Sequence, residues 1–205
     1  MTHNKNHWYD GWFYDVFIAP NQDRLFSEIK KIIEPNSKVI DIGCGTGRFS
    51  FSVADGLNKV VGIDLSKKNI DKANQTLSKI PNERISFLHS NLSNLISQNF
   101  HFDYAVMTYV IHEVNEDERI NLLNELSQIA DKIIIGDYLV PRHKGFWNLL
   151  NELVEFAAGK EHYKNFKNFV RKGGLTNLAV ETSFRILKEI INKPTTSHLI
   201  MLTKR

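Results

Sequence analysis

The feature that most constrains this chain is a short apolar run that breaks into three glycines at alternate positions, Val-Ile-Asp-Ile-Gly-Cys-Gly-Thr-Gly-Arg at residues 39–48. Apolar residues at helical spacing follow it between Phe49 and Leu57. This order predicts a strand, a tight turn and a helix, the opening of a nucleotide-binding α/β domain. Glycine suits the turn because it reaches positive φ and, without a Cβ, lets a ligand lie against the backbone.

The glycine spacing departs from the dinucleotide fingerprint, whose third glycine would stand where this chain has Arg48. The third glycine here is Gly47, one residue earlier. A second apolar run, residues 59–63, ends in Asp64, close to the position where such folds hold a ribose. A carboxylate there can accept hydrogen bonds from both ribose hydroxyls and would repel a 2′-phosphate. Either segment alone could be only a tight connection or a solvated strand end, but together they predict a nucleoside-type cofactor.

These two segments resemble the first and second motifs of the class I S-adenosylmethionine-dependent methyltransferases, at residues 39–48 and 60–66. The resemblance extends over about residues 37–140 and is looser outside them. It implies S-adenosyl-L-methionine as cofactor, S-adenosyl-L-homocysteine as product, and methyl transfer by in-line displacement. The expected acceptor is a small, partly apolar molecule, by analogy with the quinone-biosynthesis branch.

The resemblance also implies how the cofactor lies. Asp41 would sit near its methionine end, the glycine turn would cradle the amino-acid and ribose portions, and Asp64 would hold the ribose hydroxyls. Leu65 would pack on the adenine, which Asn91 and Leu92 would border. Asn91 stands where the family usually has an acidic residue, and its carbonyl oxygen can still accept a hydrogen bond. The predicted cofactor site comprises Tyr14, Asp41, Gly43, Cys44, Gly45, Thr46, Gly47, Asp64, Leu65, Asn91, Leu92, Thr108 and Tyr109.

The acceptor side has a weaker signature. If an oxygen or a neutral carbon is methylated a proton must leave, and His112 is the predicted catalytic base because it follows the fourth strand and titrates in the right range. The alternative is a histidine that caps the next helix or borders the methionine moiety. Further candidates are Glu113, Asp137, Tyr138 and His143.

Strands that alternate with helices predict a parallel sheet covered on both faces, with the ligand at the carboxyl ends of the strands. The resemblance implies a Rossmann-like, doubly wound α/β fold of seven strands, mostly parallel, with an antiparallel C-terminal strand. Apolar residues at helical spacing predict a helical insertion between the fifth and sixth strands, and most of its aromatic residues are expected to form its own core. Residues 178–191 fit either a helix or a strand. We expect a single domain over residues 1–205: a helical N-terminal lid at 1–36, a cofactor-binding core at 37–140, a substrate-side insertion at 141–177 and end strands at 178–205.

The N-terminal region is unusually aromatic. Its cluster could close the edge of the domain as a hydrophobic staple or cover the ligands as a lid, and Tyr14 is the member expected to touch the ligand. The cluster consists of Trp8, Tyr9, Trp12, Phe13, Tyr14 and Phe17.

Composition narrows the remaining options. With Cys44 as the single cysteine, neither an intramolecular disulfide nor a cysteine-based metal cluster is possible, and no metal site is predicted. A net charge of +3 is too small to indicate a nucleic-acid footprint. No run approaches the ~18 apolar residues of a membrane span, and the N-terminus does not resemble a signal peptide. We therefore expect a cytoplasmic monomer or homodimer with a small-molecule acceptor and without nucleic-acid or membrane partners. The alternatives are a catalytically silent cofactor-binding or sensing protein and a nucleotide-dependent oxidoreductase, which Arg48 disfavours.

Overall fold

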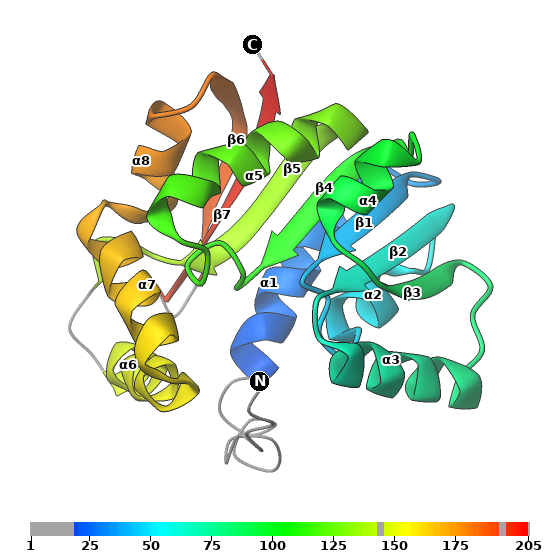
Figure 1. Cartoon of the computed structure of the whole chain (residues 1–205), viewed down its shortest axis with the longest axis horizontal. Coiled ribbons are helices and arrows are strands. Elements are labelled where there is room, and N and C mark those ends of the chain that lie inside the picture. The colour runs from blue at the N-terminus through cyan, green and yellow to red at the C-terminus, as the bar shows by residue number, and fades with distance from the viewer. Residues whose placement is uncertain (1–18, 143–145, 193–195, 205) are drawn as a thin grey trace.

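The computed structural model describes residues 19–142, 146–192 and 196–204. One seven-stranded sheet crosses the molecule, with helices on both faces (Figure 1). The strands are β1 Lys38–Ile42, β2 Lys59–Asp64, β3 Ile85–His89, β4 Phe102–Thr108, β5 Ala130–Tyr138, β6 Phe184–Ile191 and β7 Ser197–Lys204. Their order is β3-β2-β1-β4-β5-β7-β6, with β1 to β5 parallel and β7 antiparallel to both of its neighbours. The predicted doubly wound sheet with an antiparallel last strand is confirmed.

The helices divide between the two faces of the sheet. They are α1 Ala19–Ile32, α2 Arg48–Val53, α3 Lys67–Lys79, α4 Leu92–Ser97, α5 Glu116–Ile129, α6 Phe146–Ala158, α7 Lys160–Arg171 and α8 Gly174–Val180. Val39 and Val60 belong to the core that α1, α2 and α3 cover, whereas Ile40 belongs to the core under α4, α5, α7 and α8. Successive strand residues point to opposite faces, and both faces are buried, so the central strands are almost continuously apolar.

Parallel pairing brings the carboxyl ends of the central strands to one edge of the sheet. Ile42 at the end of β1 pairs with Ile63 of β2 and Met107 of β4. The turns that follow β1, β2, β4 and β5 therefore lie close together, at the edge where the sequence predicts the ligand.

The segment that fits either a helix or a strand contains one element of each kind. Residues 174–180 form α8, and residues 184–191 form β6, at the edge of the sheet. An edge strand needs only part of its surface buried, and Lys188 and Glu189 are exposed. The apolar residues of β6 therefore do not alternate cleanly, which explains why helical spacing also fits them.

The insertion between β5 and β6 consists of α6, α7 and α8. Phe166 and Phe169 of α7 are fully buried, as expected for its core. Helix α6 differs from the expectation, because its Phe156 is exposed while its Glu155 is buried. The proposed lid residues before Ala19, including Tyr14, lie outside the described part of the chain. Within that part, no helix has the length and apolar character needed to cross a membrane.

Candidate functional site

The turn after β1 requires glycine for two physical reasons. Gly43, Gly45 and Gly47 have φ of 67°, 55° and 86°, in the left-handed region that other residues adopt at a cost. A Cβ on Gly43 would lie 2.7 Å from Val110 Cγ2, and one on Gly47 would collide with the ring of Phe87. At Gly45, by contrast, a Cβ would meet nothing within 4 Å. The middle of the turn therefore presents bare backbone to open space, as a cradle for a ligand requires.

Asp64 joins this turn to the end of β2. Its Oδ2 accepts a hydrogen bond from the Gly45 N–H at 2.9 Å, and its Oδ1 accepts one from the Ser66 N–H at 2.7 Å. The Cys44 N–H donates to the Ile63 carbonyl at 3.0 Å. The side chain of Asp64 is half-buried, and each carboxylate oxygen keeps a further lone pair. The structure thus brings together the two motifs that the sequence singled out.

Asp41 lies beneath the turn and is almost completely buried. Ser50 Oγ of α2 donates to its Oδ2 at 2.7 Å, whereas no described residue donates to Oδ1. Burial raises the pKa of Asp41 to about 7, and the charge of Asp64 adds to this effect, while the Ser50 hydrogen bond opposes it. A cation or a donor at Oδ1 would lower that pKa again.

Cys44 fills space within the turn. Its side chain is buried against Gly62, where a Cβ would lie 2.9 Å from Cys44 Sγ. Burial raises the pKa of the thiol far above its usual range, with the charges of Asp41 and Asp64 acting in the same direction. The thiol is therefore neutral, as its predicted space-filling role requires. The neighbouring Thr46 is exposed.

The residues expected around the adenine lie at the ends of β2 and β3. Leu65 is 77% exposed and is available to a ligand. Asn91 Oδ1 accepts a hydrogen bond from the Asn94 N–H at 3.0 Å and so caps α4. Leu92 packs in the core, so its side chain does not border open space. This placement does not favour the expected contact of the Leu92 side chain with a base.

The end of β4 carries an unusual backbone conformation. Tyr109 has φ of 57°, and its N–H donates to the Gly136 carbonyl at 2.8 Å. Left-handed conformations of bulky residues are uncommon and concentrate at functional sites. The ring of Tyr109 packs edge-on against Tyr138 at 5.4 Å between centroids, and Thr108 beside it is half-buried.

His112 is 1% exposed and lies between two carboxylates. Its Nδ1 is 2.8 Å from Asp137 Oδ1, and its Nε2 is 3.4 Å from Glu155 Oε2. Tyr138 donates its hydroxyl to Glu155 Oε1 at 2.7 Å. Burial alone would lower the pKa of His112, but Asp137 and Glu155 outweigh it and raise that pKa well above its ordinary value. A raised pKa favours the protonated imidazole, which cannot accept a proton until it loses its own, and the role of His112 as a general base stays a prediction.

Sequence reasoning missed three residues that shape this edge. Ser50 is the partner of Asp41, Val110 packs on Gly43, and Glu155 of α6 is the second partner of His112. The sequence offers one signal for Glu155, because a glutamate interrupts the apolar pattern of α6. This signal does not reveal which residue Glu155 contacts. His143, the remaining acceptor-side candidate, lies outside the described residues. No group of histidine, cysteine and acidic residues in the described ranges is arranged to hold a metal ion.

Comparison with known proteins identifies the family. Residues 39–132 match the model of the methyltransferase domain. A protein of Methanocaldococcus jannaschii, named putative ribosomal RNA large subunit methyltransferase, is 31% identical over 85% of this chain and 41% of its own length. Demethylmenaquinone methyltransferase of Bacillus cereus is 24% identical over 67% of this chain and 61% of its own length. The chain thus spans less than two thirds of either relative.

The solved structures extend the match in fold to almost the whole chain. Magnesium protoporphyrin IX methyltransferase from Synechocystis, with bound S-adenosylhomocysteine, superposes with a TM-score of 0.69 at 20% identity, over 96% of this chain and 90% of that one. The strand order, the glycine turn joined to Asp64 and the domain match agree. This chain therefore carries a methyltransferase domain of the class I S-adenosylmethionine-dependent family.

Proposed function

We propose that this chain transfers the methyl group of S-adenosyl-L-methionine to a small, partly apolar acceptor. The observation that carries the proposal is the bond between the Asp64 carboxylate and the Gly45 N–H, beside a backbone that faces open space. Both features suit a ribose, since its hydroxyls can donate to the carboxylate and its ring can lie against a residue without a side chain.

Asp41 supplies an independent test of whether the cofactor fits. Its Oδ1 is buried, and no described residue donates to it. Such atoms are normally satisfied, so this one calls for a donor, either a water or the α-ammonium group of the cofactor. A cation nearby would also stabilise the charged form of a carboxylate whose pKa burial has raised to about 7.

When bound, S-adenosylmethionine supplies an electrophilic methyl group on a sulfonium that already leaves readily. The chain therefore needs chiefly to orient the two reactants and to keep water out. The glycine turn and Asp64 would hold the cofactor, and Thr108 and Tyr109 at the end of β4 would border it on the side of the acceptor. The left-handed Tyr109 sets the direction in which the chain leaves β4 at this point.

Several features support a small acceptor with an apolar part. Tyr109 and Tyr138 form an aromatic pair beside the end of β4, and the sequence before Ala19 is rich in tryptophan, tyrosine and phenylalanine. The acceptor in the name of the Bacillus relative is demethylmenaquinone, which belongs to this class. The name of the Methanocaldococcus relative indicates ribosomal RNA as the competing acceptor.

His112 is proposed to position the acceptor side rather than to accept a proton. Its ring links Asp137 at the end of β5 to Glu155 of α6, and these carboxylates raise its pKa and so favour the protonated ring. A positive charge held at this point would fix the distance between the cofactor-binding core and the insertion. A base, if the acceptor needs one, would then come from the acceptor or from solvent.

Calorimetry with the purified chain tests the cofactor assignment. We expect S-adenosylmethionine and S-adenosylhomocysteine to bind and NAD not to bind. Asp64→Ala should weaken binding of both by at least about tenfold, because the variant loses a charge-assisted acceptor. Asp71→Ala, which removes an exposed carboxylate of α3, is the matched control. Unchanged affinity of Asp64→Ala would refute the ribose assignment.

Transfer of a labelled methyl group tests the acceptor. Demethylated quinones and ribosomal RNA should be offered in parallel, and we expect label in the quinone fraction. Label in RNA alone would contradict the acceptor class while leaving the cofactor assignment intact. Tight cofactor binding without transfer to any acceptor would favour the silent, sensing alternative.

A further inference from the structure

Helix α6 exposes three large apolar side chains. Leu149, Leu153 and Phe156 recur at intervals of four and three residues, which places them on one side of a helix. They are 59%, 53% and 67% exposed. Asn148 and Glu155, on the side that faces the protein, are buried. We call Leu149, Leu153 and Phe156 the apolar stripe.

Polar contacts hold α6 in this orientation. Glu155 accepts from the Tyr138 hydroxyl at 2.7 Å, and Glu152 accepts from the Tyr163 hydroxyl at 2.9 Å. Glu152 also pairs with Arg142 at 2.9 Å. Turning the helix to bury the apolar stripe would break these bonds and leave the buried Tyr138 hydroxyl without its acceptor, which opposes such a turn. The contacts of Glu152 and Glu155 therefore favour the exposed position of the stripe.

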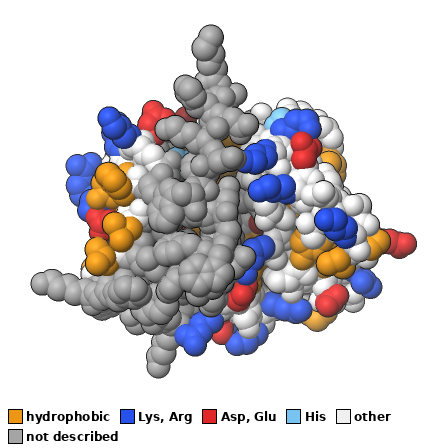
Figure 2. Space-filling model, turned by 90° about the horizontal axis from the view of Figure 1, so that it is seen from below, with side chains coloured by type: hydrophobic (Ala, Val, Ile, Leu, Met, Phe, Trp, Pro, Cys, Tyr) orange, Lys and Arg blue, Asp and Glu red, His pale blue; other side chains and the backbone are white. Residues whose placement is uncertain are grey.

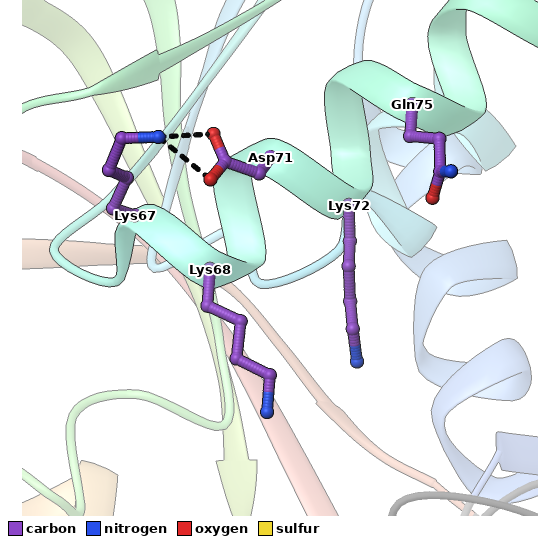
Figure 3. A pocket seen from close by; sticks show the side chains of 5 residues that line it. All are labelled: Lys67, Lys68, Asp71, Lys72 and Gln75. Carbon is purple, nitrogen blue, oxygen red and sulfur yellow. Dashed lines mark hydrogen bonds and ion pairs between the residues drawn. The ribbon is translucent and has the colours of Figure 1, made fainter. Parts of the chain in front are cut away.

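Helix α3 presents a basic surface. Its sequence contains four lysines and a single acidic residue, Asp71. Lys67, Lys68, Asp71, Lys72 and Gln75 line an open pocket, drawn in Figure 3. Lys67 pairs with Asp71 at 2.8 Å, and Figure 3 shows the side chains of Lys68 and Lys72 pointing away from α3 on one side of the helix. We call Lys67, Lys68 and Lys72 the lysine group.

The apolar stripe and the lysine group belong to one face of the molecule. Both α6 and the start of α3 follow the carboxyl ends of strands, and Figure 1 places the two helices at the same end of the domain. Figure 2 looks onto that end. Hydrophobic side chains gather at its left, on the side of α6, and Lys and Arg side chains are numerous on the side of α3.

We propose that this face binds the surface of an anionic phospholipid membrane. Exposed leucine and phenylalanine side chains on a helix enter the boundary between headgroups and acyl chains, and lysines nearby are attracted to anionic lipids. Binding of this kind requires no spanning helix. It is independent of methyl transfer, and it would bring the face that holds the glycine turn to apolar molecules dissolved in the membrane.

Two other occupants account for only part of the face. The phosphates of an RNA backbone would pair with the lysine group but would leave the exposed leucines uncovered. A second copy that packed its own stripe against this one would cover the apolar residues without using the lysine group. A membrane surface uses both, because it combines negative charge with an accessible apolar layer.

Sedimentation of the full chain with vesicles tests the proposal, without cofactor or acceptor. One set contains phosphatidylcholine alone, and the other contains phosphatidylcholine mixed with phosphatidylglycerol. We expect binding to the mixed vesicles that falls as salt is added, and much weaker binding to phosphatidylcholine.

Two sets of variants separate the contributions. Lys67→Gln, Lys68→Gln and Lys72→Gln together should lower the partition coefficient on mixed vesicles by about a hundredfold. Leu149→Ser, Leu153→Ser and Phe156→Ser together should lower it by at least about tenfold on the same vesicles. The matched controls are exposed residues outside α3 and α6: Lys30→Gln and Lys38→Gln for charge, and Val180→Ser for an exposed apolar residue. The controls should bind as the unchanged chain does.

Three results would overturn the proposal. The first is failure of the full chain to bind mixed vesicles, even if another partner is found to cover the apolar stripe. The second is vesicle binding that the stripe variant leaves unchanged. A loss of vesicle binding in that variant would also count against the proposal if light scattering showed a lower molar mass for the variant than for the unchanged chain, because the stripe would then belong to contacts between copies. The third is capture of an RNA oligonucleotide through the lysine group when vesicles do not bind.

Discussion

Helix α3 buries Ile70 and turns its lysines to solvent, whereas α6 buries Glu155 and turns Leu153 to solvent. Both helices are amphipathic, and spacing alone predicts the same packing for both. The neighbours differ. Helix α3 packs on β2 and β3, and Ile70 joins the apolar core beneath it. Helix α6 lies next to the protonated His112 and the hydroxyl of Tyr138, which need an acceptor. The burial of Glu155 follows from its neighbours, the Tyr138 hydroxyl and the His112 ring, and not from the spacing of apolar residues in α6.

The largest contrast should appear when one apolar residue is truncated in each helix. Ile70→Ala should lower the free energy of unfolding by about 4 kcal/mol, because it leaves a cavity in the core. Leu153→Ala should change it by less than about 0.5 kcal/mol, because the side chain is already in water. Urea denaturation of both variants measures the difference. Comparable losses would show that the outward orientation of α6 is wrong.

Removal of the polar anchor of α6 should have the next largest effect. Glu155→Ala leaves the Tyr138 hydroxyl without its acceptor and removes the nearer of the two carboxylates beside His112 Nε2, so that Glu113 at 3.9 Å remains there, at a cost of about 3 kcal/mol. Glu155→Gln is the control, because its amide oxygen still accepts from Tyr138 while the charge is gone, and it should lose less. If truncation of an exposed leucine of α6 cost more than Glu155→Ala, polar contacts would not be what orients this helix.

Glu155→Ala should also change how the stability of the chain depends on pH. The pKa of His112 is raised in the folded chain, so the stability it contributes is complete below its ordinary pKa of 6.5 and is lost as pH rises through the folded value. Glu155→Ala should bring that loss to lower pH. Titration of the His112 ring by NMR, alongside unfolding at each pH, would detect it, and an unchanged pKa would exclude Glu155 as a partner.

The smallest expected effect concerns Asp41, a buried carboxylate without the full set of partners that Glu155 has. Its pKa is 3.8 ordinarily and about 7 in the folded chain, so the folded state holds the proton more tightly. Stability therefore falls as pH rises between these two values. Asp41→Asn should remove about 2 kcal/mol of the difference in unfolding free energy between about pH 5 and about pH 8.

Cofactor binding supplies the control for Asp41. If the α-ammonium group of S-adenosylmethionine contacts Asp41 Oδ1, cofactor binding should be coupled to a smaller change in bound protons in Asp41→Asn than in the unchanged chain. The variant should also bind the cofactor more weakly, and its stability at alkaline pH should be higher. A variant with unchanged pH dependence would show that Asp41 is not the group whose protonation stabilises the folded chain.

Prediction from the sequence worked where the cause is local. The positive φ of Gly43, Gly45 and Gly47 demands glycine, and the apolar runs before Asp41 and Asp64 can only be buried strands. The contact between Asp64 and Gly45 then follows from parallel pairing of β1 with β2. Even the ambiguity at residues 178–191 has a local cause, since the edge strand β6 within it carries a weak pattern.

Prediction was poorer where partners come from distant parts of the chain. The sequence predicts a base at His112 because an isolated imidazole titrates near neutral pH. Carboxylates from β5 and α6 raise the pKa of His112, which the sequence could not show, and its role as a base stays a prediction. Likewise, the resemblance places Leu92 beside the adenine of the cofactor, but the Leu92 side chain packs in the core.

The sequence by itself determined the alternation of strands and helices, the turn at residues 43–47 and the acidic residue that meets it, because backbone conformation and strand burial depend on neighbouring residues. Only the tertiary structure decided which side of α6 faces the protein and which groups surround His112. Those outcomes depend on desolvation of charges brought together from different elements, and the energy of such groups is defined only once their surroundings exist.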